Sequence, residues 1–363
     1  MTTFPRGLAL LGLVGMAAGG VGAPAARAQV KLQSNATEIT LTGRVQTQFN
    51  TTSVSEELAS EFLLRRVRLT AEVEVGDFIS GKVQPDFGEG DVNLKDAWLR
   101  LNFGRGLRLK FGQFKRPFDL FELTSSTKIL VIERAGSIRG VSSCGGVGGI
   151  CSLSRFTEAL GYSDRDIGVM LDGQDRSRRL RYMVSVTNGA GANKAETNDG
   201  KTFTGRLEYS LRDGVRLAGN VSVHDFIDTV TSDSTAYATA YGADVEVGDY
   251  DGGWHLQAGV VGGDNWKRLD PTGDPRTYVT AQGILTHKSP VHGSRYLEAI
   301  EPLARVSWGN PDTNAADDQG WLITPGFALH LRGRNKIALN VDIWTPTQGD
   351  SELSFKAQSY LHF

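Results

Sequence analysis

Residues 61–75 read EFLLRRVRLTAEVEV, and this stretch decides the fold class. Its side chains alternate with the period of two that is typical of a β-strand. The mostly apolar parity contains Leu63, Val67, Leu69, Ala71, Val73 and Val75. The mostly polar parity contains Leu64, Arg66, Arg68, Thr70, Glu72 and Glu74. Arg65 breaks the pattern, because it falls on the apolar parity. A soluble sheet would turn the apolar parity to a core, whereas a membrane barrel would turn it to lipid and the charged parity to a lumen.

The first 28 residues have the parts of a secretory signal peptide in their usual order. Arg6 forms a positive start, residues 8–18 are apolar, and residues 26–28 read Ala-Arg-Ala. The apolar run is too short for a membrane-spanning helix; the alternative is a buried N-terminal helix. We predict cleavage after Ala28 and one exported outer-membrane β-barrel domain of residues 29–363.

The composition agrees with either a soluble protein or a membrane β-barrel. Hydrophobic residues make up 40% of the chain and charged residues 22%. These values are ordinary for soluble proteins, but a barrel also has them because only alternate residues of its strands face lipid. Residues 29–363 contain no apolar run near 18 residues, so no transmembrane helix is expected.

Segments with period-two alternation recur between turn signals along residues 29–363. Most approach the roughly 9–11 residues that a tilted strand needs to cross a bilayer. The sixteen predicted spans are 37–49, 62–75, 78–86, 92–103, 107–114, 165–172, 178–187, 201–210, 214–224, 237–248, 253–262, 276–285, 296–308, 319–331, 335–344 and 353–363.

The connections between these segments alternate in length. The even ones are tight turns such as 76–77, 104–106, 211–213 and 332–334, except for a slack one at 286–295, whereas the odd ones are mostly long. Outer-membrane barrels have short periplasmic turns and longer outer loops. We therefore predict an all-β, transmembrane, antiparallel up-and-down β-barrel of sixteen strands, with both termini on the periplasmic side.

The third outer connection, residues 115–164, is far longer than the roughly 15 residues beyond which structureless loops are functional or disordered. It contains TKILVIERAG at 127–136, which is too apolar to extend into water. We predict that this loop folds into the pore and packs on the barrel wall; the alternative is a surface excursion. Its Gly-rich part holds the two cysteines of the chain, Cys144 and Cys151, for which we predict a disulfide in an oxidising compartment.

Energetics assigns the two faces of each strand, because a Lys or Arg in lipid at the bilayer midplane costs about 2–4 kcal/mol. By this rule thirteen basic residues point into the lumen: Arg44, Arg66, Arg68, Arg100, Arg108, Lys110, Arg179, Arg181, Arg206, Arg216, Arg305, Lys336 and Lys356. Ten acidic residues point inward as well: Glu72, Glu74, Asp96, Asp166, Asp172, Glu208, Asp244, Glu246, Glu301 and Asp342.

Position along the chain says more than this small basic excess. Six inward basic residues fall on the first five predicted strands: Arg44, Arg66, Arg68, Arg100, Arg108 and Lys110. Such a ladder could pass an anion along one wall through charge-assisted hydrogen bonds. The alternative is that these charges pair with acids and keep the lumen wet.

Four stretches together resemble the phosphate-selective porin O and P family of bacterial outer-membrane porins. They are FLLRRVRLTAEVEV at 62–75, VNLKDAWLRLNF at 92–103, LRLKFGQFKRPFDLFELTSS at 107–126 and VIERAG at 131–136. The resemblance is strongest over residues 39–136. It implies a homotrimer of sixteen-stranded barrels in the outer membrane, with an inward third loop (115–164) that forms a constriction.

The resemblance also implies site residues by position: Arg65, Arg66, Asp96, Lys115, Ser125, Ser126, Glu133 and Arg134. Two departures concern the constriction loop. Thr127 stands where the family usually has a basic residue and Lys128 follows it, and the segment with Cys144 and Cys151 is not part of the family pattern. Arg65 remains a conflict, because its parity points outward. Either it lies at the rim or in a trimer contact, or a bulge turns it inward.

The sequence thus predicts an outer-membrane channel for the passive diffusion of small anions, phosphate or polyphosphate, guided by the basic ladder. The alternative is a general, weakly selective porin for small hydrophilic solutes. The expected anion-binding residues are Arg44, Arg65, Arg66, Arg68, Asp96, Arg100, Arg108, Lys110, Lys115, Ser125, Ser126, Lys128 and Arg134. We find no nucleophile motif, no metal-ligand spacing and no nucleic-acid module, so neither an enzyme nor a cofactor or metal is expected.

Overall fold

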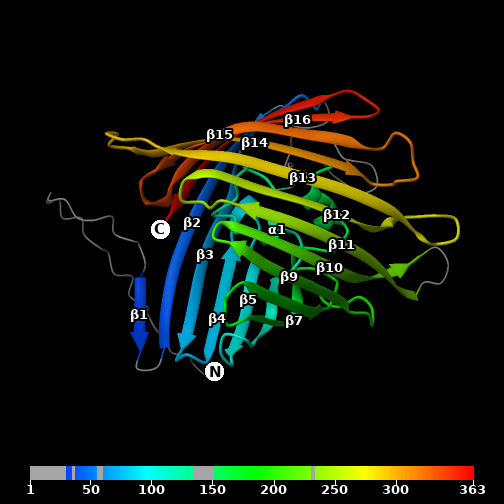
Figure 1. The fold of residues 1–363 in the computed structure, drawn as a ribbon, viewed down its shortest axis with the longest axis horizontal. Coiled ribbons are helices and arrows are strands. Elements are labelled where there is room, and N and C mark those ends of the chain that lie inside the picture. Colours follow the sequence, from blue (N-terminus) through cyan, green and yellow to red (C-terminus); the bar gives the residue numbers. More distant parts are fainter. Residues whose placement is uncertain (1–29, 35–36, 55–59, 135–150, 230–233) are drawn as a thin grey trace, which may run out of the picture.

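The computed structural model describes residues 30–34, 37–54, 60–134, 151–229 and 234–363. Within these ranges sixteen antiparallel strands, β2–β17, form a closed barrel in which β17 pairs back onto β2 (Figure 1). Their bounds are β2 Thr37–Thr52, β3 Ser60–Val75, β4 Ile79–Asp86, β5 Asn93–Asn102, β6 Arg108–Lys115, β7 Arg165–Gln174, β8 Leu180–Thr187, β9 Thr202–Arg212, β10 Val215–Asp228, β11 Ser234–Val247, β12 Gly253–Leu269, β13 Pro275–Pro290, β14 Leu297–Asn310, β15 Gly320–Leu331, β16 Lys336–Pro346 and β17 Glu352–His362.

The predicted fold class and strand count are confirmed, because each predicted span overlaps one strand of the barrel. A short additional strand, β1 (Val30–Ser34), pairs with the beginning of β2. The main difference is length: β12 and β13 continue well beyond the predicted 253–262 and 276–285. Their ends carry polar residues such as Asp264 and Asn265, which interrupt the apolar alternation without ending the ladder. The slack connection expected at 286–295 is therefore mostly strand up to Pro290.

The two faces of the barrel differ as the lipid argument requires. On β9, Phe203 and Leu207 are exposed on the outside, whereas Thr204 and Arg206 are buried inside. The same alternation recurs around the barrel, so exposed apolar side chains form its outer surface. Of the basic residues assigned to the lumen, seven are buried inside: Arg44, Arg66, Arg68, Arg206, Arg305, Lys336 and Lys356. Arg179 instead lies exposed in the turn before β8.

Strand β3 contains a bulge that reverses the parity assigned to its first residues. Gln46 on β2 pairs with Arg66, but the next residue, Thr47, pairs with Leu64, so Arg65 has no partner in this ladder. A bulge residue shifts the alternation by one. Leu64 is therefore on the outside and 53% exposed, whereas the simple alternation placed it on the lumen face. The simple alternation therefore assigned the wrong face to Leu64, before the bulge, and the correct face to the residues that follow Arg65.

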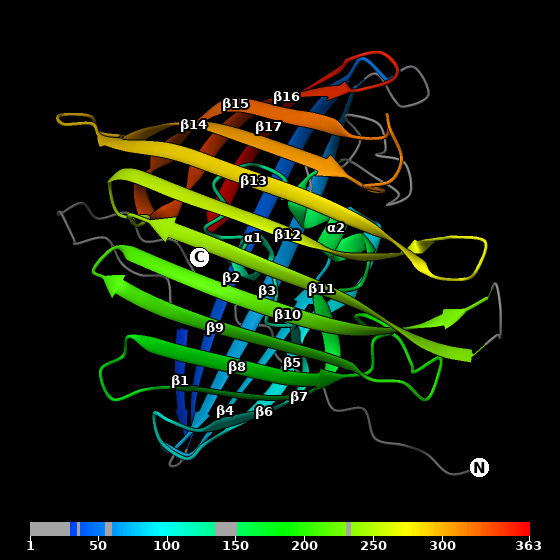
Figure 2. The ribbon, with the colours of Figure 1, turned by 45° about the vertical axis from the view of Figure 1, so that its right-hand side comes forward.

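The described parts of the connection between β6 and β7, residues 116–134 and 151–164, fold into the barrel, as predicted. It carries the helices α1 (Leu120–Leu123) and α2 (Leu153–Ala159), which lie inside the ring of strands (Figure 2). The hydroxyl of Ser152 caps α2 by accepting from the Arg155 backbone N–H. The largest apolar cluster of the described chain joins this loop to strands β10–β16: Phe118, Phe121, Leu130, Val131, Cys151, Leu153, Phe156, Leu160 and Tyr162 from the loop, with Phe226, Ala238, Ala240, Val261, Tyr278, Ile284, Leu303, Leu322 and Trp344 from the wall. The main core thus lies inside the lumen, against one half of the wall.

Two short 3₁₀ turns complete the elements, η1 (Gly88–Gly90) and η2 (Arg332–Arg334). None of the helices in the described ranges has the length and apolar character that a membrane crossing requires. The predicted signal peptide, residues 1–28, lies outside the described residues and stays a prediction. Cys144 also lies outside them. Cys151 is fully buried and is not a free thiol, and its pairing with Cys144 stays a prediction.

Gly112 on β6 is expected to be essential for the approach of β5 and β6. Its φ of +119° favours glycine, and a Cβ there would lie 2.2 Å from the carbonyl oxygen of Ala97. Replacing Gly112 with alanine should destabilise the barrel by about 1–3 kcal/mol from the backbone conformation alone. Urea unfolding in detergent measures this effect. The control is Gly219→Ala, because a Cβ at Gly219 meets nothing within 4 Å. Equal stability of the two variants would contradict the prediction.

Candidate functional site

Both arginines of the pair at 65–66 point into the barrel and bind one carboxylate of the loop. Arg65 donates to Glu133 with Nε–Oε1 and Nη2–Oε2 distances of 2.6 and 3.1 Å. Arg66 donates to the same carboxylate at 3.3 Å and to Gln46 at 2.9 Å. The bulge therefore settles the conflict over Arg65 in favour of an inward side chain. We call Gln46, Arg65, Arg66 and Glu133 the Glu133 cluster.

The Glu133 cluster fixes the loop electrostatically. Burial opposes the ionisation of Glu133, but Arg65 and Arg66 together hold the pKa of this carboxyl below its usual value. Arg65 also forms an ion pair with Glu89 on the rim of the barrel, at 2.9 Å. The two hydrogen bonds from Arg65 to Glu133 form a bidentate contact, which is the strong form of an arginine–carboxylate pair. These two arginines, which were predicted to bind the anion, are engaged in holding the loop.

Arg68 connects the wall to the tip of the loop. Its Nε lies 2.5 Å from Asp86, and its Nη1 donates to the Ser126 hydroxyl at 3.0 Å. The side chain of Gln46 also donates to the Ser126 carbonyl oxygen, at 3.3 Å. Ser126 is therefore buried against β2 and β3, whereas its neighbour Ser125 is exposed to the lumen. The two predicted serines therefore have different roles: Ser126 anchors the loop to the wall, and Ser125 lines the lumen.

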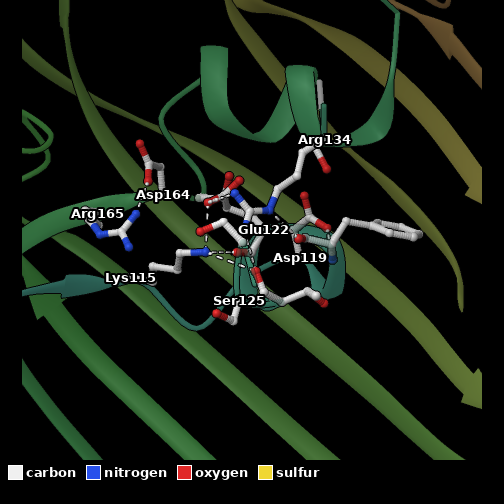
Figure 3. A network of polar contacts seen from close by, with 12 residues as sticks. Lys115, Asp119, Glu122, Ser125, Arg134, Asp164 and Arg165 are labelled. Atoms are coloured by element: carbon white, nitrogen blue, oxygen red, sulfur yellow. Dashed lines mark hydrogen bonds and ion pairs between the residues drawn. The ribbon is translucent and has the colours of Figure 1, made fainter. Parts of the chain in front are cut away.

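Lys115 and Arg134 hold the turn around α1 from both sides (Figure 3). The Lys115 ammonium group lies 3.1 Å from Glu122 Oε1 and also donates to the Glu122 carbonyl oxygen. Arg134 donates to the carbonyl oxygens of Phe121, at 2.9 Å, and Thr124. Burial opposes the ionisation of Glu122, but Arg134 and Lys115 lower its pKa to about 2. The two predicted anion ligands are thus part of the scaffold of the loop.

Strands β14 and β16, which are joined to β2 and β3 through β17, also anchor the loop, through residues that the sequence reasoning assigned only to the lumen. Arg305 on β14 donates to the carbonyl oxygens of Glu133 and Arg134, at 2.8 and 3.1 Å. Lys336 on β16 donates to the carbonyl oxygen of Ile129 at 3.0 Å. Residues 129–134 of the loop are therefore held by the adjoining strands β14–β16 and β3 of one side of the barrel.

Asp96 has a cationic partner that the sequence reasoning did not place. Arg165, the first residue of β7, donates to it at 2.8 Å, and the Lys82 ammonium group lies 3.8 Å away. Arg108 is likewise paired with Asp172 on the neighbouring strand. These pairs occupy the acids of the β4–β7 wall.

Four of the predicted cations have no carboxylate within ion-pair distance among the described residues: Arg44, Arg100, Lys110 and Lys128. Arg44 is opposite Arg68 in the β2–β3 ladder. Arg100 and Lys110 are opposite each other in the β5–β6 ladder. Lys128, at the exposed tip of the loop, lies 5.2 Å from the ring centre of Tyr250 on the far side. The structure thus places Lys128 away from the arginine ladder rather than beside it.

A cavity of about 230 Å³ opens between strands β4–β8 and the loop. Its lining includes Lys82, Asp96, Lys110 and Lys115, together with Asp172 and Arg181. It lies on the half of the wall that the apolar cluster of the loop leaves free.

The structure brings most predicted residues to one wall but gives them different partners. The sequence reasoning named Glu133 without its partners Arg65 and Arg66, and it missed the counter-ion Asp86 and the contribution of Arg165. A signal existed for Asp86, because it continues the inward parity of its strand. None existed for Arg165, because its partner lies on a strand distant in sequence.

Comparison with known proteins agrees with this geometry. A model of the family described as phosphate-selective porin O and P matches residues 39–251. The anion-selective porin from Comamonas acidovorans superposes with a TM-score of 0.63 at 11% identity, covering 90% of this chain and 100% of that chain. The outer-membrane channel DcaP of Acinetobacter baumannii has a TM-score of 0.60 at 13% identity, with coverage of 91% and 99%.

The outer-membrane protein OmpT of Vibrio cholerae, in its trimer form, superposes with a TM-score of 0.54 at 12% identity, covering 90% of this chain and 100% of that chain. At such identities these likenesses concern the fold. No curated protein sequence matches this chain significantly.

Proposed function

This chain belongs to the phosphate-selective porin O and P family, and on that premise we propose that it conducts small anions, phosphate or polyphosphate, by passive diffusion. It is a porin channel of the bacterial outer membrane rather than an enzyme. The prediction that the chain is not an enzyme is therefore confirmed. The identity of the solute and its selectivity are the parts that we propose.

The observation that carries the proposal is the set of unpaired cations in the lumen. Arg44, Arg100, Lys110 and Lys128 have no ion-pair partner in the described part of the chain. Three carboxylates of the same wall, Asp86, Asp96 and Asp172, are each already paired with an arginine. Unpaired cations between neutralised pairs give the lumen a positive potential, which is the usual device of anion pores.

The division of roles follows from these contacts. Arg65, Arg66 and Arg68 position the loop, because their guanidinium groups bind Glu133, Asp86 and Ser126. The unpaired cations attract and guide the anion, and the exposed Ser125 and Lys128 contact it at the loop tip. Conduction requires that each site bind weakly enough to release the ion. A short series of cations along the wall meets this requirement better than one enclosed site.

We further propose that the channel is a homotrimer. A structural relative, OmpT of Vibrio cholerae, has a trimer form. Size-exclusion chromatography with light scattering in detergent tests this assembly, and a monomeric mass would contradict it.

The competing function is a general, weakly selective porin, which the near balance of inward charges favours. The reversal potential in a KCl gradient across planar bilayers separates the two. For the wild-type channel we expect a reversal potential with the sign of anion selectivity. A reversal potential with the sign of cation selectivity would reject the proposal.

Phosphate block of the chloride current tests the unpaired cations one at a time. A unit charge within 4 Å of the anion is worth about 1 kcal/mol in water, so Arg44→Gln or Lys128→Gln should weaken the block about fivefold. The control is Lys201→Gln, which removes the same charge from the connection before β9, where Lys201 is paired with Glu196. If the block is unchanged in both lumen variants, these two residues do not belong to the anion path.

A further inference from the structure

Four apolar side chains interrupt the polar lining of the lumen on neighbouring strands. They are Trp98 on β5, Phe114 on β6, Met170 on β7 and Met183 on β8, and they form a cluster separate from the main core. Phe114, Met170 and Met183 are 5% exposed or less. The lumen face of a water-filled pore is expected to be polar. These four side chains therefore depart from the polar lining that a water-filled pore requires.

Cations surround this patch and approach its aromatic rings. The Lys110 ammonium group lies 5.0 Å from the ring centre of Trp98 and 5.5 Å from that of Phe114. The Arg100 guanidinium group lies 4.9 Å from the Trp98 ring centre. Lys110 is also directly opposite Met170 in the β6–β7 ladder. Positive charge and apolar surface thus alternate over a few residues of adjoining strands.

The patch and the cations line the same cavity of about 230 Å³. Lys82, Lys115 and Arg181 also line it, and each lies within 3.5 Å of a carboxylate, that of Glu72, Glu122 or Glu208. Its two acids are already engaged, Asp96 by Arg165 and Asp172 by Arg108. Pro117 and Leu123 of the loop add apolar surface to the lining of this cavity. Six of its twelve lining residues are apolar and six are charged. Small-molecule sites likewise combine apolar surface with charged groups that orient the ligand.

We propose that this cavity is a site for an organic anion with an aromatic body, such as an aromatic carboxylate. The carboxylate would contact the Lys110 and Arg181 cations, and the ring would pack on the thioethers of Met170 and Met183. Methionine sulfur adapts to irregular surfaces and contacts aromatic rings favourably. A small hydrated ion such as phosphate gains nothing from apolar surface and loses hydration there. The inference rests on the proposed anion channel, because it names a second class of anion for the same pore.

Block of the chloride current in planar bilayers tests the inference, with benzoate, acetate and inorganic phosphate as probes. Acetate and benzoate share the carboxylate and differ in the ring. Because burying the ring adds apolar contact, benzoate should block the wild-type channel at about one tenth of the acetate concentration. This comparison needs no variant. Equal block by the two carboxylates would overturn the inference, and if phosphate block persists the proposed anion channel still stands. A cation-selective channel that none of the three anions blocks would overturn both.

Variants locate the site. Met183→Gln and Met170→Gln keep the length of the side chain but make it polar. In each variant, the ratio of the acetate to the benzoate concentration that blocks the chloride current should therefore fall by several fold. The matched control is Val184→Thr, the residue next to Met183, whose side chain is exposed on the outside of the barrel. Its block by benzoate should equal that of the wild type. An undiminished preference for benzoate in both methionine variants would place the aromatic site elsewhere and overturn the proposal. If neither methionine variant folds, Arg181→Gln gives the test. It should weaken block by benzoate, and unchanged block would overturn the proposal.

Discussion

Replacing Phe156 with alanine is expected to release the inward loop from the wall and to enlarge the channel. Phe156 is fully buried in α2, stacks on Tyr278 of β13 with ring centres 5.3 Å apart, and packs against Gly309 of β14. Truncating a buried phenylalanine costs about 3–5 kcal/mol, which here falls on the docking of the loop. The barrel itself is closed by its own backbone ladders and should persist.

Single-channel recording measures this effect, because an undocked loop should raise the conductance and its fluctuations. The control is Phe203→Ala, which removes the same ring from the outside of the barrel, where Phe203 is exposed. Wild-type conductance in Phe156→Ala would mean that the loop is held by its polar contacts alone.

Replacing Glu133 with glutamine is expected to loosen the polar anchor of the loop at residues 132–134. The change removes the carboxylate that Arg65 and Arg66 share and leaves two inward guanidinium groups without this partner. Breaking one partner of a buried ion pair costs about 3–5 kcal/mol. The loss should expose the backbone N–H of Ile132, which donates to Asn340 on β16 at 2.7 Å.

Hydrogen–deuterium exchange of the segment around residue 132 reports this loosening directly. We expect faster exchange there in Glu133→Gln, without faster exchange in the strands. Glu89→Gln is the matched control, since Glu89 pairs with Arg65 at the exposed rim, and such pairs are worth about 0–1 kcal/mol. Equal protection in the two variants would show that the Glu133 cluster does not hold the loop.

The architecture could be read from the sequence because it depends on a local property. A strand that separates lipid from a polar lumen must alternate residue by residue, and strands such as β9 do so clearly. The lengths of the connections then order the strands. The apolar sequence at 127–136 was likewise sufficient to predict that the third loop folds inward, because it could not remain in water.

The candidate site was only partly predictable, because alternation shows which side a charge faces but not what it contacts. Arg68 and Lys110 both point inward, yet Arg68 is neutralised by Asp86 whereas Lys110 has no carboxylate partner in the described chain. The pairing depends on which strands are adjacent and at what register. Lys128 was expected to bind the anion at the constriction loop, but the sequence did not indicate that its ammonium group lies 5.2 Å from the ring centre of Tyr250.

Arg65 shows most clearly where the two kinds of information separate. The sequence by itself determined a sixteen-stranded barrel with a charged lumen, because lipid on one side and water on the other impose a strict period on every strand. Only the tertiary structure decided that Arg65 turns inward. The bulge that turns it exists through the register of β3 against β2, and its partner Glu133 lies 68 residues later on a different segment. Local alternation cannot encode a contact between distant segments, and such contacts determine which lumen charges hold the loop and which remain to meet an anion.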